Sequence, residues 1–249
     1  MSLAHTNVAN AKVRLIGWWP FDGDTQNYSG LDNHSTAYGD PTFVNGKVGS
    51  NAIYLDGDDY VRMNGLADDI TDNDCTFSGW VKTTVASDTY WFSCNTLGRG
   101  NVALRGIDSS GVAMIVDGPS PAYKFCHSTT IVNDDEWHLL TFTRAGSLGT
   151  TYVDGVAENT YTTTPAFSFS LDDRWSIGQE WDGGGPSNFL TDDVDDVRFY
   201  DVALSAAQVL DLFNGGVPCR WGASSKGCPC GGGGLVRKMV RNKRKLALH

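Results

Sequence analysis

The segment of residues 22–33 carries the side chains from which calcium sites are built. Its sequence, DGDTQNYSGLDN, holds carboxylates at Asp22, Asp24 and Asp32 and amides at Asn27 and Asn33. Hard cations such as Ca²⁺ take several oxygen ligands from carboxylates, amides and carbonyls. An EF-hand loop is excluded, because the sixth position lacks Gly and the twelfth lacks Glu. Two interpretations stay open: a calcium site, or a series of turns capped by short polar side chains.

A second candidate site is the segment of residues 179–188, QEWDGGGPSN, where a tryptophan is surrounded by glycines and short polar residues. The flat indole of Trp181 suits stacking on a sugar ring, and Asp182 and Asn188 suit hydrogen bonds to its hydroxyl groups. Tyr123 follows a turn-like DGPSP sequence and is a further candidate on the same rim. The segment predicts a glycan-binding loop, and the alternative is a loop tryptophan packed on the edge of the fold.

The sequence lacks the alternating acid pattern of a catalytic strand. A retaining glycosidase needs two carboxyl groups about 5 Å apart, which a strand can supply through a Glu-x-Asp-x-Glu pattern or a close variant. Asp193 and Asp195 do share one face of a strand, and a structural role is the alternative for that pair. Glu136, Glu158 and Glu180 are isolated glutamates, and Gly-x-Ser-x-Gly, His-Glu-x-x-His and phosphate-loop motifs are absent. We therefore predict that the chain is not an enzyme, with a degenerate glycosidase as the alternative.

The elements that position these residues are predicted to be strands. Of the 29 acidic residues, 26 are Asp, and 29 residues are Gly, a composition that favours turns over helices. Short apolar or alternating runs with Gly-Asp, Asp-Gly and Asn-Gly pairs between them predict an all-β, two-sheet antiparallel sandwich. Four tryptophans inside these runs, at positions 18, 80, 137 and 175, are expected in the core. The runs lie at residues 15–21, 52–55, 60–63, 76–83, 89–93, 102–107, 112–117, 124–128, 137–144, 150–153, 175–178 and 194–200.

One helix is predicted, at residues 206–213. Ser205 and Gln208 have the spacing of a capping box, and Asn214-Gly215 follow as a stop signal. An apolar face predicts that the helix packs back on the sandwich. That face consists of Val209, Leu212 and Phe213.

Charge divides the chain into an acidic body and a basic tail. The net charge is −10, yet residues 220–249 contain eight Lys or Arg and no acidic residue. We predict an N-terminal extension at residues 1–12, one domain at residues 13–216, and a Cys- and Gly-containing hinge with a basic tail at residues 217–249. Such a tail suits docking on a capsid or another assembly surface, and contact of the tail with nucleic acid stays open as an alternative.

The sequence leaves the redox state of its six cysteines open. They are at positions 75, 94, 126, 219, 228 and 230. A disulfide between Cys94 and Cys126 could join neighbouring strands, whereas free thiols are the alternative because no secretory signal is visible.

The sequence contains no candidate membrane span, because no apolar run approaches the roughly 18 residues that a span requires. We expect a location outside the cell, on a cell surface or on a virion surface.

Six short segments follow one another along the chain: GWWPFD (17–22), YLDGDDYV (54–61), FSGWV (77–81), WH (137–138), YVDG (152–155) and VDDVRFY (194–200). Their order and spacing resemble the laminin G-like group of the concanavalin A-like lectin/glucanase jelly rolls. The resemblance covers roughly residues 13–213 and implies two curved antiparallel sheets packed face to face. Asp192 departs from the pattern, because members of this group commonly have Gly at that position.

The same resemblance implies binding rather than catalysis. It implies a calcium ion held by Asp22, Asn27, the carbonyl of Gly30, Asn33 and Asp195, with Asn27 standing where an acid is more usual. It also implies a non-catalytic glycan-binding or adhesion module whose partner is a carbohydrate or glycoconjugate. The alternative hypothesis is a structural or decoration protein on a virion or other particle, docked through its C-terminal tail.

Overall fold

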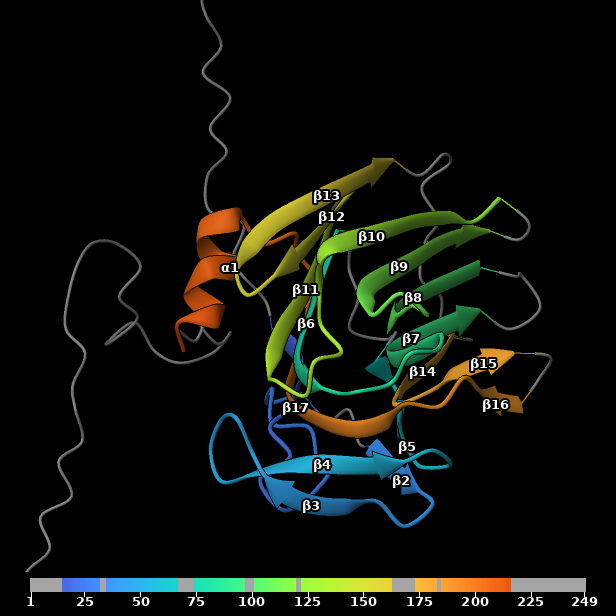
Figure 1. Cartoon of the computed structure of the whole chain (residues 1–249), viewed down its shortest axis with the longest axis vertical. Helices are drawn as coiled ribbons and strands as arrows, with labels where there is room; N and C mark the ends of the chain where they lie inside the picture. Colours follow the sequence, from blue (N-terminus) through green and yellow to red (C-terminus); the bar gives the residue numbers. More distant parts are fainter. Residues whose placement is uncertain are drawn as a thin grey trace, which may run out of the picture.

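A computed structural model describes residues 15–31, 35–66, 74–96, 101–119, 122–162, 173–182 and 185–215. These residues form two antiparallel sheets packed face to face, with a short helix on an outer face (Figure 1). The predicted all-β sandwich is therefore confirmed. The predicted extension at residues 1–12 and the predicted tail at residues 217–249 lie outside the described residues.

The first sheet contains eight strands. They are β1 (Leu15–Trp19), β3 (Thr42–Asn45), β4 (Asn51–Asp56), β6 (Cys75–Lys82), β11 (His138–Ala145), β12 (Leu148–Val153), β13 (Val156–Thr162) and β17 (Thr191–Tyr200). Their order is β13-β12-β11-β6-β17-β4-β3, and β1 pairs with β17 beside this path. Because β17 pairs with β6, β4 and β1, this strand connects much of the sheet.

The second sheet contains seven strands in the order β10-β9-β8-β7-β14-β5-β2. They are β2 (Ser35–Tyr38), β5 (Tyr60–Met63), β7 (Thr89–Thr96), β8 (Asn101–Ile107), β9 (Val112–Pro119), β10 (Lys124–Ile131) and β14 (Asp173–Ile177). A separate hairpin is formed by β15 (Glu180–Asp182) and β16 (Gly185–Ser187).

The strand order excludes a disulfide between Cys94 and Cys126. Cys94 lies on β7 and Cys126 on β10, and two other strands separate them. Both are buried free thiols, as is Cys75. The suggested pairing of Cys94 with Cys126 is therefore wrong, because sequence does not reveal which strands are neighbours.

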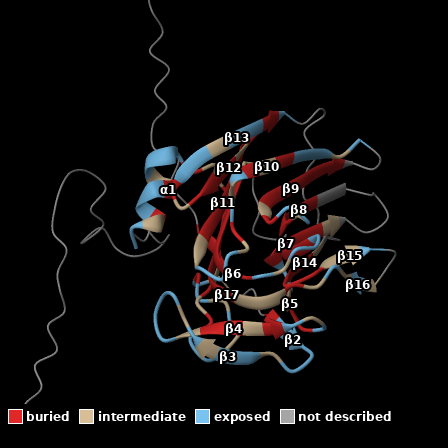
Figure 2. Ribbon diagram, in the orientation of Figure 1, coloured by how far each residue is buried: buried red, intermediate tan, exposed pale blue. Residues whose placement is uncertain are grey.

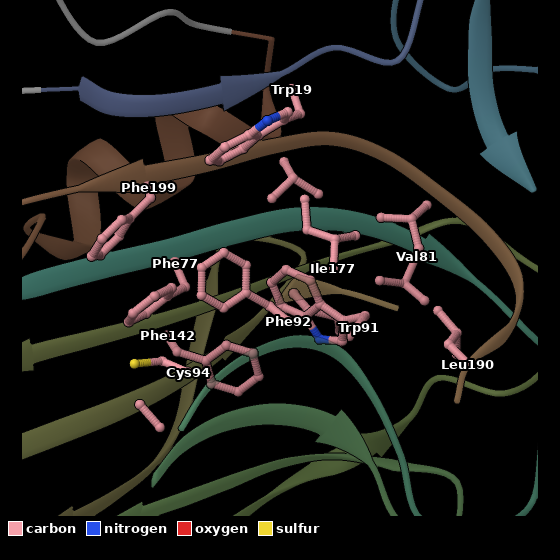
Figure 3. Close-up of a cluster of buried hydrophobic side chains, with 14 of the residues drawn as sticks. Trp19, Phe77, Val81, Trp91, Phe92, Cys94, Phe142, Ile177, Leu190 and Phe199 are labelled. Atoms are coloured by element: carbon pink, nitrogen blue, oxygen red, sulfur yellow. The ribbon is translucent and has the colours of Figure 1, made fainter. Parts of the chain in front are cut away.

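The space between the sheets is filled by aromatic and aliphatic side chains (Figures 2 and 3). Phe77 of β6 lies near its centre, with ring centroids 4.4 Å from Phe199 and 4.5 Å from Phe92. Alternate residues of a strand face opposite sides, so each strand contributes every second side chain to this layer. Burying a side chain of this size stabilises the fold by about 1.5–3 kcal/mol.

A charged pair is enclosed in the same interior. The guanidinium of Arg105 donates to the carboxylate of Asp117 at 2.6 Å, and both side chains are almost fully buried. Tyr161 donates its hydroxyl to the same carboxylate, and the Arg105 guanidinium lies 4.8 Å from the ring centroid of Phe77. Burial by itself lowers the pKa of Arg105, but the charge of Asp117 raises it on balance. The guanidinium therefore stays charged inside the sandwich.

The predicted helix is confirmed as α1 (Ala206–Phe213). The Ser205 side chain caps the backbone of Gln208, and the Gln208 side chain returns to the Ser205 backbone. Val209 and Leu212 are buried against the outer face of the eight-stranded sheet, in a cluster that includes Trp80. No helix in the described part of the chain is long and apolar enough to cross a membrane.

Asp192 stands at the position where the family resemblance leads one to expect Gly. Its φ of 133° lies in a region that L side chains rarely adopt. Its carboxylate accepts hydrogen bonds from the Thr83 hydroxyl at 2.7 Å and the Thr84 N–H at 2.9 Å. These bonds offset the backbone strain by joining the end of β6 to β17.

Candidate functional site

Trp181 lies in a hairpin, so the prediction of a loop is wrong. It is the central residue of β15 and faces Pro186 of β16 in the pairing register. Its backbone N–H donates to Oδ1 of Asn95 on β7 at 3.3 Å. Two short strands with glycines between them are typical of a hairpin, so the glycines of this segment indicated a hairpin in the sequence.

The indole of Trp181 is half-buried on the outer face of the seven-stranded sheet. Two guanidinium carbons lie near its ring centroid, Arg174 at 5.1 Å and Arg62 at 5.6 Å. Tyr60 meets the indole edge-on, with centroids 5.6 Å apart, and Tyr38 stacks on Tyr60 at 4.6 Å. Cation–π and edge-to-face contacts of this kind hold an aromatic ring in one orientation.

Of the other predicted glycan contacts, Asp182 is next to this indole on β15, whereas Tyr123 packs on a separate group of residues. Asp182 is exposed beside it on β15. Asn188 is exposed, and its side-chain amide donates to the Asp88 carbonyl at 3.2 Å. Tyr123 packs on a separate apolar group on the outer face of the same sheet. That group consists of Tyr90, Leu104, Met114 and Val116.

Glu180, which looks isolated in the sequence, shares a face of β15 with Asp182, because residues two apart on a strand point the same way. Burial raises the pKa of Glu180 to about 7, and the negative charges of Asp182 and Asp88 contribute to the shift. At neutral pH this carboxyl can therefore either donate or accept a hydrogen bond. Glu180 was not among the predicted site residues, because it does not begin a Glu-x-Asp-x-Glu pattern.

Two of the predicted calcium ligands, Asp22 and Asp195, accept hydrogen bonds from the backbone of one turn. Asp22 Oδ1 accepts from the N–H groups of Ser50 at 2.5 Å and Asn51 at 3.0 Å. Asp195 Oδ2 accepts from the N–H groups of Lys47 and Val48, both at 2.8 Å. Both carboxylates therefore face the turn between β3 and β4, residues 46–50.

Asp195 is a buried carboxylate with one oxygen that is unpartnered within the described part of the chain. Its side chain is fully buried, and its Oδ1 has no hydrogen-bond partner among the described residues. Burial raises the pKa of this carboxyl to about 7, against the opposing effect of the Val48 N–H. A buried carboxylate oxygen without a donor is unfavourable, and a cation at Oδ1 would remove that cost.

The remaining predicted ligands fit less well. Asn27 Oδ1 accepts from the N–H groups of Trp18 and Ser29, both at 2.9 Å, so this oxygen is already engaged. Gly30 is exposed with a φ of 93°, and Asn33 lies outside the described residues. Among the predicted ligands that the structure describes, Asp195 Oδ1 is therefore the buried oxygen that a cation could engage, while the Asn27 side chain fits a turn cap.

A further acidic cluster was not predicted. Ligand oxygens of Asp40, Asp58 and Asp59 lie within 4.8 Å of one another. Asp59 is buried, but its two oxygens accept from the backbone N–H groups of Asp40 at 2.8 Å and Asp56 at 3.2 Å. The cluster is therefore explained by turn capping.

Two tryptophans expected in the core are not there. Trp175 is buried between the sheets as predicted, and Trp80 is buried beneath α1. Trp18 and Trp137 are only half-buried and line a cleft on the outer face of the eight-stranded sheet. Neighbouring residues on a strand face opposite sides, so the Trp18-Trp19 pair could place only Trp19 in the core.

Two antiparallel sheets with aromatic and acidic groups on their outer faces define a lectin-like jelly roll. The chain belongs to the Concanavalin A-like lectin/glucanases superfamily, because a laminin G family model of that description matches residues 55–210. The resemblance seen in the sequence is thereby confirmed. A search of curated proteins found no match.

Solved structures share the fold at low identity. Domain 4 of AbnA, a GH43 extracellular arabinanase from Geobacillus stearothermophilus in complex with arabinotriose, is 21% identical with a TM-score of 0.65, covering 81% of this chain and 98% of that one. Botulinum neurotoxin type C, which depends on two ganglioside molecules to enter cells, is 12% identical with a TM-score of 0.63, covering 82% and 51%. A SAP-like pentraxin from Limulus polyphemus is 20% identical with a TM-score of 0.52, covering 60% and 74%. These likenesses show the fold alone.

Proposed function

We propose that this chain is a non-catalytic glycan-binding module. The observation that carries the proposal is the Trp181 indole, held on the outer face of the seven-stranded sheet by Arg62, Arg174 and Tyr60. A fixed aromatic ring can stack on a sugar, and the exposed Asp182 carboxylate beside it can accept hydrogen bonds from the sugar hydroxyls. Structures with the same fold are described with arabinotriose and with gangliosides, which supports a carbohydrate or glycoconjugate as the partner. A location outside the cell or on a surface follows from such a partner.

The proposal expects binding without turnover, and Glu180 with Asp182 is the pair at which this expectation is tested. The two carboxyl groups share a face, and Glu180 titrates near neutral pH, as a general acid would. Residue 184, where a Glu-x-Asp-x-Glu pattern would place a further acid, is Gly. The test is saccharide release from a panel of polysaccharides. Release by the parent that is lost in Glu180→Gln, with the melting temperature unchanged, would contradict the non-catalytic proposal and show an enzyme instead.

Changing Trp181 to Ala tests the binding surface. We expect the variant to lose at least tenfold in affinity for the glycans that the parent binds on an array, because the stacking platform is gone. Its stability loss should stay below the roughly 3–5 kcal/mol that a fully buried tryptophan costs, since the ring is half-buried. The matched control is Phe125→Ala, whose ring is 57% exposed on β10. Equal array binding by parent and Trp181→Ala would remove this surface from the site, and a blank array for the parent would contradict the function.

We also propose that Ca²⁺ binds at Asp22 and Asp195. Calcium at 100 times its dissociation constant should add about 2.7 kcal/mol of stability, seen as a higher melting temperature that a chelator reverses. Asp195→Asn should abolish the response, whereas Asp40→Asn, in the separate acidic cluster, should retain it. A melting temperature that is the same with chelator and with millimolar calcium would contradict this site. A calcium response that is lost only in Asp40→Asn would place the ion at the separate acidic cluster instead.

The decoration-protein hypothesis depends on the tail at residues 217–249. Those residues lie outside the described part of the chain, so this alternative stays a prediction from the sequence.

A further inference from the structure

We propose that the cleft on the outer face of the eight-stranded sheet is a second saccharide-binding site. This inference rests on the proposed glycan-binding function. The cleft has a volume of about 560 Å³, within the roughly 300–1,000 Å³ typical of small-molecule sites. Its walls come from the end of α1, the turn at residues 46–50, strands β1, β6 and β17, the residue before β11 and the turn after β12. The lining includes Trp18, Lys47, Trp80, Trp137, Asp154 and Arg198.

The cleft and the Trp181 surface lie on opposite sides of the molecule. Trp18, on β1, faces away from Trp19, which is in the core. Trp181 packs on Arg174, which faces away from Trp175, also in the core. Figure 1 shows the same relation, with α1 on one side of the sandwich and the β15–β16 hairpin on the other. A ligand in the cleft is therefore distinct from one on the Trp181 surface.

The three indoles of the cleft differ in what already contacts them. The Lys47 ammonium lies 4.8 Å from the Trp80 ring centroid. The Arg198 guanidinium lies 5.6 Å from the Trp18 ring centroid, and the Trp18 Nε1–H donates to Asp196 at 2.7 Å. Trp137 is half-buried and packs against the apolar cluster beneath α1, and among the described residues no aromatic or cationic group lies on its ring. Trp137 is therefore the cleft indole whose remaining surface a sugar ring can use.

A carboxylate beside this indole is held in position. Asp154 Oδ2 is 2.9 Å from His138 Nδ1, and Asp154 Oδ1 accepts from the Leu139 N–H at 2.9 Å. The Asp154 side chain is still 32% exposed. A carboxylate oriented by two partners and open to solvent can accept hydrogen bonds from sugar hydroxyls, which is how polar groups give a ligand site its specificity.

The charges of the cleft favour a neutral saccharide. Asp196 and Arg198 neutralise each other in an ion pair of 2.8 Å. Lys47 and Asp154 contribute one positive and one negative charge, so no excess of either sign is left for an ionic ligand. A cationic ligand is further disfavoured, because the protein's own Lys47 and Arg198 already approach two of the three indoles. Stacking on Trp137 with hydrogen bonds to Asp154 and Lys47 suits the hydroxyl-rich edge of a neutral sugar.

The test compares four proteins on one array of neutral oligosaccharides that includes arabinotriose, xylotriose, cellotriose and maltotriose. The full chain, Trp137→Ala, Trp181→Ala and the double variant are measured, and each hit is quantified by calorimetry. We expect one group of hits to weaken at least tenfold in Trp137→Ala and to persist in Trp181→Ala, and the double variant to bind nothing. Calorimetry of the full chain should then show more than one site.

Two further variants protect the test against misfolding. Trp137→Phe keeps an aromatic face and should bind within a few-fold of the parent, and Asp154→Asn should weaken the same hits at least tenfold with an unchanged melting temperature. Binding that is unchanged in both Trp137→Ala and Asp154→Asn overturns the second site while leaving the proposed function intact. A parent that binds no saccharide overturns both.

Discussion

Replacing Asp117 by Ala is expected to lower the free energy of unfolding by about 3–5 kcal/mol. The substitution leaves the Arg105 guanidinium in the interior without the carboxylate that faces it at 2.6 Å. It also removes the acceptor of the Tyr161 hydroxyl. An uncompensated buried charge costs more than the pair contributes, because the ion stays desolvated after its partner is gone. Urea unfolding of the parent and the variant measures the difference.

Two controls separate this effect from the loss of any ion pair. Asp135→Ala breaks the pair between Lys82 and Asp135, whose side chains are 31% and 68% exposed, and should cost about 0–1 kcal/mol. The double variant Arg105→Met/Asp117→Leu removes both charges and should recover much of the loss. If Asp117→Ala costs no more than Asp135→Ala, the pair is not buried in solution.

Replacing Phe77 by Ala should cost a similar amount, about 3–5 kcal/mol. The ring packs between Phe199 and Phe92 and also lies 4.8 Å from the Arg105 guanidinium carbon, so its removal leaves a cavity beside a buried charge. The control is Phe43→Ala on edge strand β3, where the ring is 36% exposed. Equal midpoints of urea unfolding for these two variants would contradict the packing of the core.

The strands that sequence reasoning found are the ones that bury a face. Each of the apolar runs overlaps a strand of the structure, including β5 at Tyr60–Met63 with identical bounds. The runs missed β2, β3 and β13, whose residues are mostly exposed, and the two three-residue strands β15 and β16. Apolar alternation reports burial rather than pairing. Strands at the edges of the sheets hydrogen-bond without burying a face, so they leave no such pattern.

The candidate sites were predictable only in part, because they assemble residues far apart in the chain. The sequence marked Trp181 but not Arg62 or Arg174, which approach it only after β5 and β14 pair. The acid-rich segment indicated Asp22 and the family resemblance added Asp195, but the turn whose backbone N–H groups bind both carboxylates could not be predicted from their spacing. The departure at Asp192 was visible in the sequence, yet the hydrogen bonds from Thr83 and Thr84 that make it tolerable needed the structure.

The Trp181 surface and the cleft on the eight-stranded sheet lie on opposite outer faces. This placement determines how the two proposed sites would engage polysaccharide. Packed sheets are about 10 Å apart, and a layer of outward side chains lies beyond each of them. A short oligosaccharide that fills one surface therefore cannot reach the other around the sandwich. Each molecule would bridge two separate glycan chains, and its avidity would rise with the density of chains on a surface rather than with the length of any one of them.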